Sequence, residues 1–130
     1  MNANRLKTYV LWVAIIIIGI GSLACSMQTP KELPLAQLIK EGAVLIDVRS
    51  IDEFKEGSVT GAINIPINLL PYCIETIDTT KHVIIFCKSG NRAGKAKKIL
   101  EENHITDVTN GGSWQNVQEA VDKSAASEVK

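Results

Sequence analysis

The chain has 130 residues, of which 45% are hydrophobic and 22% are charged, and its 14 basic residues balance its 14 acidic ones. This length gives room for one domain, and a net charge of zero gives no overall attraction for nucleic acid. Arg5 and Lys7 precede an apolar segment, and subtracting these two leaves residues 26–130 with 12 basic and 14 acidic residues. Any anion site in the folded part must therefore come from the local arrangement of the chain.

The first 27 residues predict a targeting or membrane segment that is separate from the fold. A basic stretch is followed by the apolar run 10–20 (VLWVAIIIIGI) and then by small residues. This order is typical of a secretory signal. Residues 8–27 are also long enough for an uncleaved helix across a bilayer. Because the basic residues lie on the N-terminal side, we expect the rest of the chain to be exported to the periplasm or to the extracytoplasmic face of the membrane.

Cys25 adds a lipoprotein signal to the two alternatives of a secretory signal and a membrane anchor. Residues 22–25 (SLAC) resemble the cleavage box of bacterial lipoproteins, although such boxes usually carry the large aliphatic residue three places before the Cys, whereas Leu23 is two before it. Signal peptide, lipoprotein signal and uncleaved membrane anchor remain alternatives, and all three imply export. Residues 28–31 are then a linker.

The remaining residues predict alternating strands and helices. Apolar runs of strand length predict strands, and apolar residues on one face predict helices. The predicted helices are 33–40, 50–56, 68–77 with an interruption near Pro71, 92–102 and 113–121; the predicted strands are 43–48, 62–65, 82–86 and 106–109. The strands are nearly continuous apolar runs, which favours a parallel sheet in an α/β domain. We expect a turn at 110–112, a domain that spans 32–122 and a polar tail at 123–130.

The segment from Cys87 to Arg92 (CKSGNR) joins the most apolar strand to the longest helix of this prediction. A thiol placed there faces the N-terminus of a helix, where unpaired N–H groups favour an anion. Gly90 lets the backbone curl so that successive N–H groups converge, and Lys88 and Arg92 add positive charge. These features favour the thiolate, which is the nucleophilic form of cysteine.

Four motifs in order resemble the rhodanese family of single-domain proteins over nearly all of residues 32–120. They are VLIDVR (44–49) followed by Glu53-Phe54, GAINIP (61–66), VIIFCKSGNRA (83–93), and Asn110-Gly111-Gly112 with Trp114. The resemblance implies a three-layer α/β/α fold with a five-stranded parallel sheet. It also implies a sulfurtransferase that takes sulfane sulfur from a donor such as thiosulfate and passes it through a cysteine persulfide to cyanide or a thiol. It implies no cofactor or metal, and we expect a monomer.

The resemblance also assigns roles to individual residues. Cys87 is the expected nucleophile, and a supporting group lies upstream in the first motif, where we expect Arg49 to pair with Glu53 behind the loop. The expected persulfide-binding loop is Lys88, Ser89, Gly90, Asn91 and Arg92, and the expected supporting residues are Asp47, Arg49 and Glu53. Ala93 stands where the family often has Ser or Thr, which predicts reduced activity. Ser58 stands where many members have His, which we expect to matter little.

Two other functions are compatible with this loop. Phosphatases of related fold have five residues between Cys and Arg, whereas four separate Cys87 from Arg92, which favours a ring that fits one sulfur atom. A sulfur-carrier or binding module without turnover of its own is the second alternative. The sequence has no CxxC pair or His/Cys cluster, so no zinc site is expected, and a bridge between Cys73 and Cys87 remains open.

Overall fold

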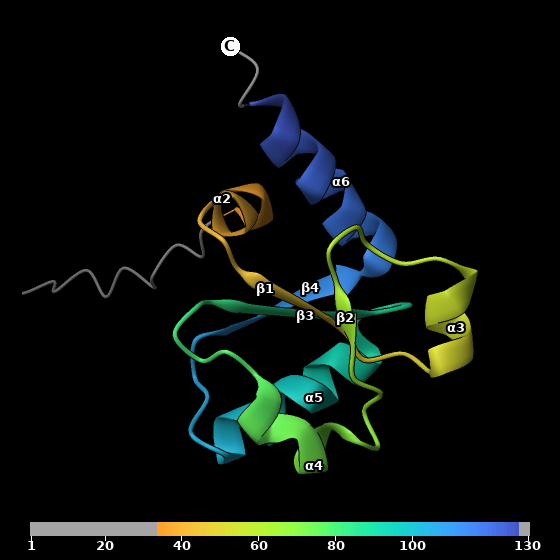
Figure 1. Cartoon of the computed structure of the whole chain (residues 1–130), viewed down its shortest axis with the longest axis vertical. Helices are drawn as coiled ribbons and strands as arrows, with labels where there is room; N and C mark the ends of the chain where they lie inside the picture. Colours follow the sequence, from red (N-terminus) through yellow and green to blue (C-terminus); the bar gives the residue numbers. More distant parts are fainter. Residues whose placement is uncertain (1–33, 128–130) are drawn as a thin grey trace, which may run out of the picture. The chain divides into compact units, whose positions relative to one another are not determined.

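A computed structural model of the chain describes residues 34–127 (Figure 1). The predicted targeting segment 1–27 and linker 28–31 lie outside the described residues, so signal, lipoprotein and anchor remain open. No helix within residues 34–127 is both long and apolar enough to cross a bilayer.

The described residues form one sheet of four parallel strands in the order β2-β1-β3-β4. The strands are β1 (Val44–Asp47), β2 (Ile63–Asn64), β3 (Val83–Cys87) and β4 (Val108–Ser113). The prediction of a parallel sheet in an α/β domain is confirmed. The fifth strand that the resemblance implies is not among residues 34–127.

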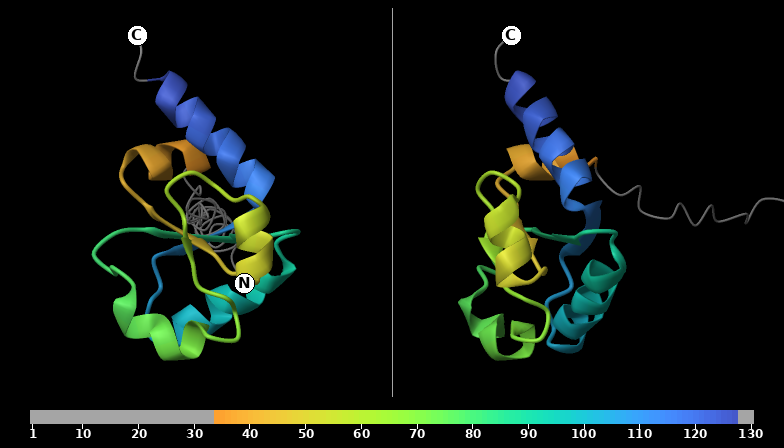
Figure 2. Two further views of the ribbon diagram at one scale, coloured as in Figure 1. Left: turned by 45° about the vertical axis from the view of Figure 1, so that its right-hand side comes forward. Right: turned by 90° about the vertical axis from the view of Figure 1, so that its right-hand side faces the viewer.

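Helices cover both faces of this sheet and form the outer two of three layers (Figures 1 and 2). One face carries α2 and α6, the opposite face carries α4 and α5, and α3 lies near the carboxyl ends of the strands. The helices are α2 (Leu35–Lys40), α3 (Ile51–Glu56), α4 (Leu70–Cys73) followed by the 3₁₀ turn η1 (Ile74–Thr76), α5 (Asn91–Glu102) and α6 (Trp114–Ala126).

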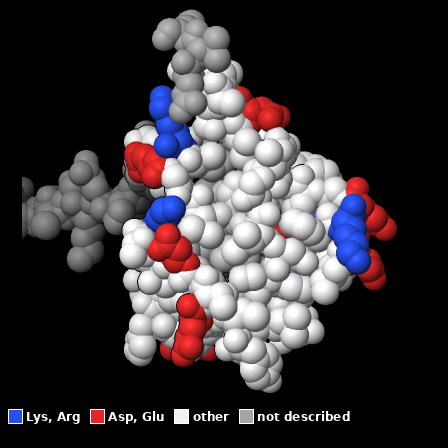
Figure 3. Space-filling view, in the orientation of Figure 1, with Lys and Arg blue, Asp and Glu red and all other residues white. Residues whose placement is uncertain are grey.

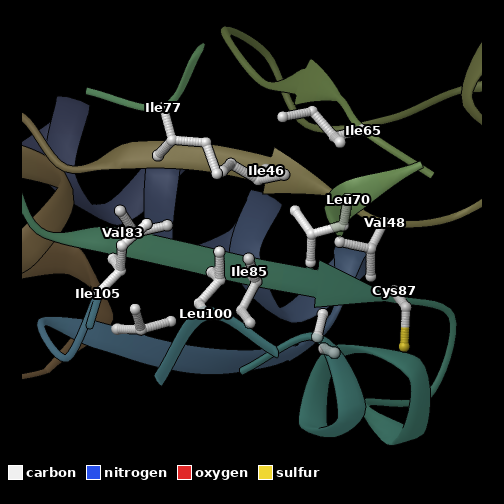
Figure 4. Packing of buried hydrophobic residues seen from close by; sticks show 13 residues of the cluster. Ile46, Val48, Ile65, Leu70, Ile77, Val83, Ile85, Cys87, Leu100 and Ile105 are labelled. Carbon is white, nitrogen blue, oxygen red and sulfur yellow. The ribbon is translucent and has the colours of Figure 1, made fainter. Parts of the chain in front are cut away.

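The two faces of β3 explain why its sequence is apolar at every position. All five residues of the strand are at most 1% exposed. Val83, Ile85 and Cys87 pack toward α5 (Figure 4), whereas Ile84 and Phe86 pack with residues of α2 and α6. Because successive side chains of a strand point to opposite faces, a strand between two helical layers has no solvent side. The end of β3, which carries Cys87, is thereby held rigidly.

The structure confirms the predicted start of α3 and corrects the predicted interruption of the helix near Pro71. Ser50 caps α3 and forms a capping box with Glu53, as the spacing predicts. The interruption predicted near Pro71 is wrong, because Pro71 lies in the first turn of α4, where a missing N–H costs nothing. The helical path instead changes after Cys73, where α4 passes into η1.

The predicted turn at 110–112 is part of β4 in the structure. The register between β3 and β4 shifts between Ile85 and Phe86, so that Gly111 bulges out of the ladder. Only a glycine fits there, because a Cβ on Gly111 would lie 2.6 Å from Cγ2 of Val117. The bulge lets α6 pack closely on the sheet. The same helix continues to Ala126, beyond the predicted end at 121 and into the predicted tail.

Two alanine substitutions test this packing. Gly111→Ala should lower the free energy of unfolding by about 1–3 kcal/mol because the new methyl group overlaps the core. Gly94→Ala, inside α5, should leave stability unchanged or raise it by up to about 1 kcal/mol, since the nearest atom to its Cβ is at an ordinary 3.6 Å. Urea unfolding followed by circular dichroism measures both, and equal effects of the two substitutions would contradict the bulge.

Candidate active site

The order of the strands places a crevice at the carboxyl ends of β1 and β3. The chain leaves β1 toward β2 on one side, whereas it leaves β3 through α5 toward β4 on the other side. Such a reversal opens a crevice that binds ligands in α/β sheets. Asp47, at the end of β1, is the register partner of Phe86, and Cys87 follows Phe86. The predicted nucleophile and its supporting residues therefore meet at one edge of the sheet.

The loop from Cys87 to α5 curls around the sulfur atom. The N–H of Gly90 donates a hydrogen bond of 3.0 Å to Cys87 Sγ. Gly90 has φ +90°, a left-handed conformation that favours glycine, and a Cβ there would lie 3.3 Å from the Cα of Gly112. Gly90 is also the N-cap of α5, so the sulfur faces the N-terminus of a 12-residue helix, as predicted.

Two opposing effects set the pKa of Cys87. Burial is the largest single effect and raises the pKa, because the residue is only 1% exposed and the charged thiolate loses water. The backbone N–H groups of Ala93, Ser89, Gly90 and Arg92 lower it and together outweigh the burial. The net result is a thiol whose pKa lies below its ordinary value. The predicted thiolate site is thus built mainly from peptide groups.

Arg92 contributes its backbone N–H to this site, and its charged side chain also interacts with the thiolate although it is bound elsewhere. Its guanidinium group forms a bidentate ion pair with Glu53, with bonds of 2.7 Å and 2.8 Å to the two carboxylate oxygens. This contact, together with the N–H of Ser50, holds the pKa of Glu53 well below its usual range. The same pair raises the pKa of Arg92. The pair ties α3 to the start of α5.

The predicted pairing of Arg49 with Glu53 is therefore wrong. Arg49 donates from its backbone N and Nε to Oδ1 of Asp47, at 2.9 Å and 3.0 Å, and from a terminal nitrogen to Oδ2 at 2.7 Å. The reason is local, since Arg49 precedes the Ser50 cap and does not share a helical face with Glu53. Asp47 and Arg49 are 0% and 5% exposed, so each neutralises the other inside the protein.

The buried pair organises the segments around it. Arg49 also donates to the carbonyl oxygen of Gly57 at 2.6 Å, and its guanidinium lies 5.3 Å from the ring centre of Trp114. Ser58 donates to Oδ2 of Asp47 at 2.6 Å, so this serine adds a hydrogen bond to the carboxylate of the ion pair, although we expected it to matter little. The pair thereby connects β1, the segment after α3 and the start of α6, behind the cysteine loop.

A hollow of about 270 Å³ lies beside Lys88, the first residue after Cys87. Its lining residues are Arg49, Glu53, Glu56, Gly57, Lys88, Trp114 and Gln115. On the face shown in Figure 3, acidic and basic side chains lie side by side at the end where α3 is found. There is no broad basic surface on that face, which agrees with an anion site that depends on local geometry.

The structure separates the predicted loop residues into different roles. Ser89, Gly90 and Arg92 act on the sulfur through their backbones, Lys88 lines the hollow, and Asn91 is the first residue of α5. The N–H of Ala93 also acts on the sulfur and completes a cradle of backbone N–H groups from Ser89, Gly90, Arg92 and Ala93. The sequence did not predict the part played by Ala93, because a backbone N–H is present whatever the side chain is. Asn110 was predicted only as a turn residue, yet its side chain contacts the loop at Gly90.

Cys73 is a free thiol in the structure, half-buried at the end of α4, and Cys87 is free as well. The bridge between them that the sequence left open is therefore not formed here.

Comparison with known proteins shows which family the sequence matches. The profile of the Rhodanese-like domain family matches residues 31–120. The protein YqhL of Bacillus subtilis is 34% identical over 110 residues, which are 82% of this chain and 86% of YqhL. The thiosulfate sulfurtransferase PspE of Escherichia coli is 36% identical over 74 residues, 55% of this chain and 71% of PspE.

Solved structures agree with these sequence matches. A rhodanese with anions from E. coli superposes with a TM-score of 0.54 at 36% identity, covering 57% of this chain and 89% of that one. The human single-domain sulfurtransferase TSTD1 superposes with a TM-score of 0.57 at 26% identity, covering 65% of this chain and 89% of that one.

The ion pair between Glu53 and Arg92 predicts a pH-dependent loss of stability. Glu53→Gln should lower the free energy of unfolding by about 1 kcal/mol near pH 7, a modest value because solvent screens the pair. The folded-state pKa of Glu53 is depressed, so its contribution is fully present above the unfolded pKa of about 4.3 and declines as the pH falls below it. Urea unfolding of wild type and variant between about pH 3 and pH 7 measures the difference.

Glu56→Gln is the matched control for this substitution. Glu56 lies on the same short helix and is exposed, so its replacement should change stability by less than about 0.5 kcal/mol at any pH. A difference between Glu53→Gln and wild type that stays constant down to pH 3 would contradict the assigned ion pair.

Proposed function

Since the chain belongs to the rhodanese-like domain family, we propose that it is a sulfurtransferase that carries sulfur as a persulfide on Cys87. The observation that supports this most directly is the set of backbone N–H groups that surround the sulfur of Cys87 and lower its pKa. The lower pKa raises the fraction of Cys87 that is thiolate at neutral pH above that of an ordinary cysteine, and the thiolate is the nucleophile that sulfur transfer needs.

The first step loads the enzyme from a donor such as thiosulfate. The Cys87 thiolate attacks the outer sulfur of thiosulfate, a new S–S bond forms, and the old S–S bond breaks. Sulfite leaves with the electron pair of that bond, and Cys87 becomes a persulfide with one negative charge on its terminal sulfur. Total charge is conserved and no proton moves, so this step needs no general acid. The cradle of N–H groups is suited to an anionic sulfur both before and after the transfer.

The second step passes the sulfur to a thiophilic acceptor. A thiolate or cyanide attacks the terminal sulfur of the persulfide, the S–S bond to Cys87 breaks, and the Cys87 thiolate is regenerated. The products are a persulfide of the acceptor thiol, or thiocyanate. The hollow beside the loop, with Trp114 and Lys88 in its lining, offers space through which an acceptor approaches.

Three observations favour sulfur transfer over phosphate hydrolysis. Cys87 is 1% exposed, so a donor that presents a single sulfur atom reaches it more easily than a tetrahedral phosphoryl group. The guanidinium of Arg92 is already bound by Glu53 and is not free to grip phosphate oxygens. The residues between Cys87 and Arg92 include no Asp or Glu that could protonate a leaving oxygen.

The nucleophile can be tested directly. Incubation with thiosulfate should add one sulfur atom to Cys87, detected by mass spectrometry of the intact protein and of its peptides. Cys87→Ser should abolish this adduct and thiocyanate formation from thiosulfate and cyanide, because the hydroxyl is a poor nucleophile for sulfur.

Cys73→Ser is the matched control and should keep both activities. Thiocyanate formation that survives in Cys87→Ser would refute the proposed mechanism. A stable sulfur adduct without turnover to cyanide or small thiols would instead identify a sulfur carrier that serves one protein partner. Hydrolysis of an aryl phosphate by the wild-type protein would favour the phosphatase alternative.

We also propose that this chemistry takes place outside the cytoplasm. The support is the sequence of residues 1–27, in which a basic stretch precedes an apolar run. A reporter enzyme fused after Lys130 should be active only outside the cytoplasm. Cys25→Ser should release the protein from membranes if the segment is a lipoprotein signal, and should leave it bound if the segment is an anchor. A reporter active in the cytoplasm would reject export.

A further inference from the structure

The side chain of Asn110 links the bulge of β4 to the cysteine loop. Its Nδ2 donates to the carbonyl oxygen of Gly90 at 3.1 Å, across 20 positions of sequence. Its Oδ1 accepts from the N–H of Gly112 at 2.9 Å, which holds the side chain against its own strand. Asn110 is thus anchored by one end and contacts the loop with the other.

Gly90 is the point at which this link reaches the sulfur. Its carbonyl oxygen accepts from Asn110 and from the N–H of Gly94, the first hydrogen bond of α5. Its own N–H donates to Cys87 Sγ. The two peptide groups that flank Gly90 are joined only through the φ and ψ of a glycine, the residue with the fewest steric restraints. The direction of its N–H is therefore sensitive to how firmly its carbonyl group is held.

We propose that Asn110 is a positioning residue of the sulfur site, which holds the carbonyl group of Gly90 so that the N–H of Gly90 stays directed at Cys87. This inference rests on the proposed function in one respect, namely that the thiolate of Cys87 is the working form of the site. Among the described contacts Asn110 makes no hydrogen bond to the sulfur and does not line the hollow, so its effect on the sulfur runs through Gly90.

The chemistry of the amide explains why asparagine suits this position. The link needs a donor toward Gly90 and an acceptor toward Gly112, and an asparagine side chain carries both. Aspartate has no donor, and serine is too short to reach Gly90 but can still accept from an N–H two residues on. Asn110→Ser therefore removes the contact with Gly90 and keeps the local turn. Because Asn110 is exposed, the substitution leaves the core filled.

Alkylation of Cys87 by iodoacetamide against pH, followed on the Cys87 peptide by mass spectrometry, is the direct test. The wild-type midpoint should lie below the free value of about 8.5. In Asn110→Ser the midpoint should rise by about half a pH unit, as expected for one weakened hydrogen bond to the thiolate. The charged groups around the thiol are Arg92 with its partner Glu53, the buried pair of Asp47 and Arg49 behind the loop, and Lys88, and all five are unchanged in the variant.

Asn116→Ser is the matched control. Asn116 donates to the carbonyl oxygen of Gly111 at 2.8 Å, so it holds the same bulge but has no contact with Gly90. Its substitution should leave the midpoint unchanged. An unchanged midpoint in Asn110→Ser would overturn the proposal, because it shows that the contact with Gly90 does not affect the thiol. Equal shifts in the two variants would overturn it as well, because they show that the bulge as a whole matters and not this contact.

Sulfur transfer supplies a second measurement with a distinct signature. Well below the alkylation midpoint of the wild-type protein, the rate of persulfide formation in Asn110→Ser should fall about threefold, which is the loss of thiolate that half a pH unit produces there. The deficit should disappear above about pH 9.5, where both proteins are ionised. A deficit of the same size at every pH would show general damage to the loop and would contradict positioning.

Nuclear magnetic resonance of the wild-type protein tests the contact without any variant. The side-chain amide signals of Asn110 should shift with the titration of Cys87, whereas those of Asn116 should not. Asn110 signals that do not change during this titration would refute the proposed link from Asn110 through Gly90 to Cys87. Neither the alkylation nor the resonance experiment needs a sulfur donor, so absence of turnover with thiosulfate would reject the proposed function and still leave the role of Asn110 decided.

Discussion

Backbone N–H groups at the start of α5 converge on the sulfur of Cys87, and this arrangement has to overcome a large opposing effect. The sulfur is buried at the end of the central strand β3, and burial by itself raises the pKa of a thiol. Peptide dipoles are effective here because they are fixed by the helix and the loop, and they need no rearrangement when charge develops. A small displacement of the loop would leave a buried, neutral thiol of little reactivity.

Three contacts from different parts of the chain hold this loop in place. The buried pair of Asp47 and Arg49 joins the end of β1 to the start of α6, behind the loop. The half-buried pair of Glu53 and Arg92 ties α3 to the first turn of α5. The side chain of Asn110 reaches Gly90 from β4. Each contact involves a different strand or helix, so the geometry around the sulfur depends on the whole domain rather than on the loop sequence alone.

The ion pair of Arg92 also bears on which chemistry the site favours. A free guanidinium group binds a tetrahedral oxyanion in bidentate fashion, which suits phosphoryl transfer. Here both carboxylate oxygens of Glu53 occupy that group, and the sulfur is stabilised by peptide N–H groups instead. Such a site matches a single anionic sulfur atom, whose charge is concentrated at one point. The arrangement is therefore consistent with membership of the rhodanese-like family.

The sequence by itself determined the α/β class, the parallel order of apolar strands, the capping box at Ser50 and the position of Cys87 between a strand and a helix. These features depend on neighbouring residues, where apolar periodicity and capping chemistry act directly. Only the tertiary structure decided which carboxylate Arg49 and Arg92 would each select, and that Asn110 would contact Gly90. Those contacts join residues from separate elements. Several partners of suitable charge were available to each, and the choice followed from strand order, the bulge at Gly111 and the direction in which each side chain leaves its element.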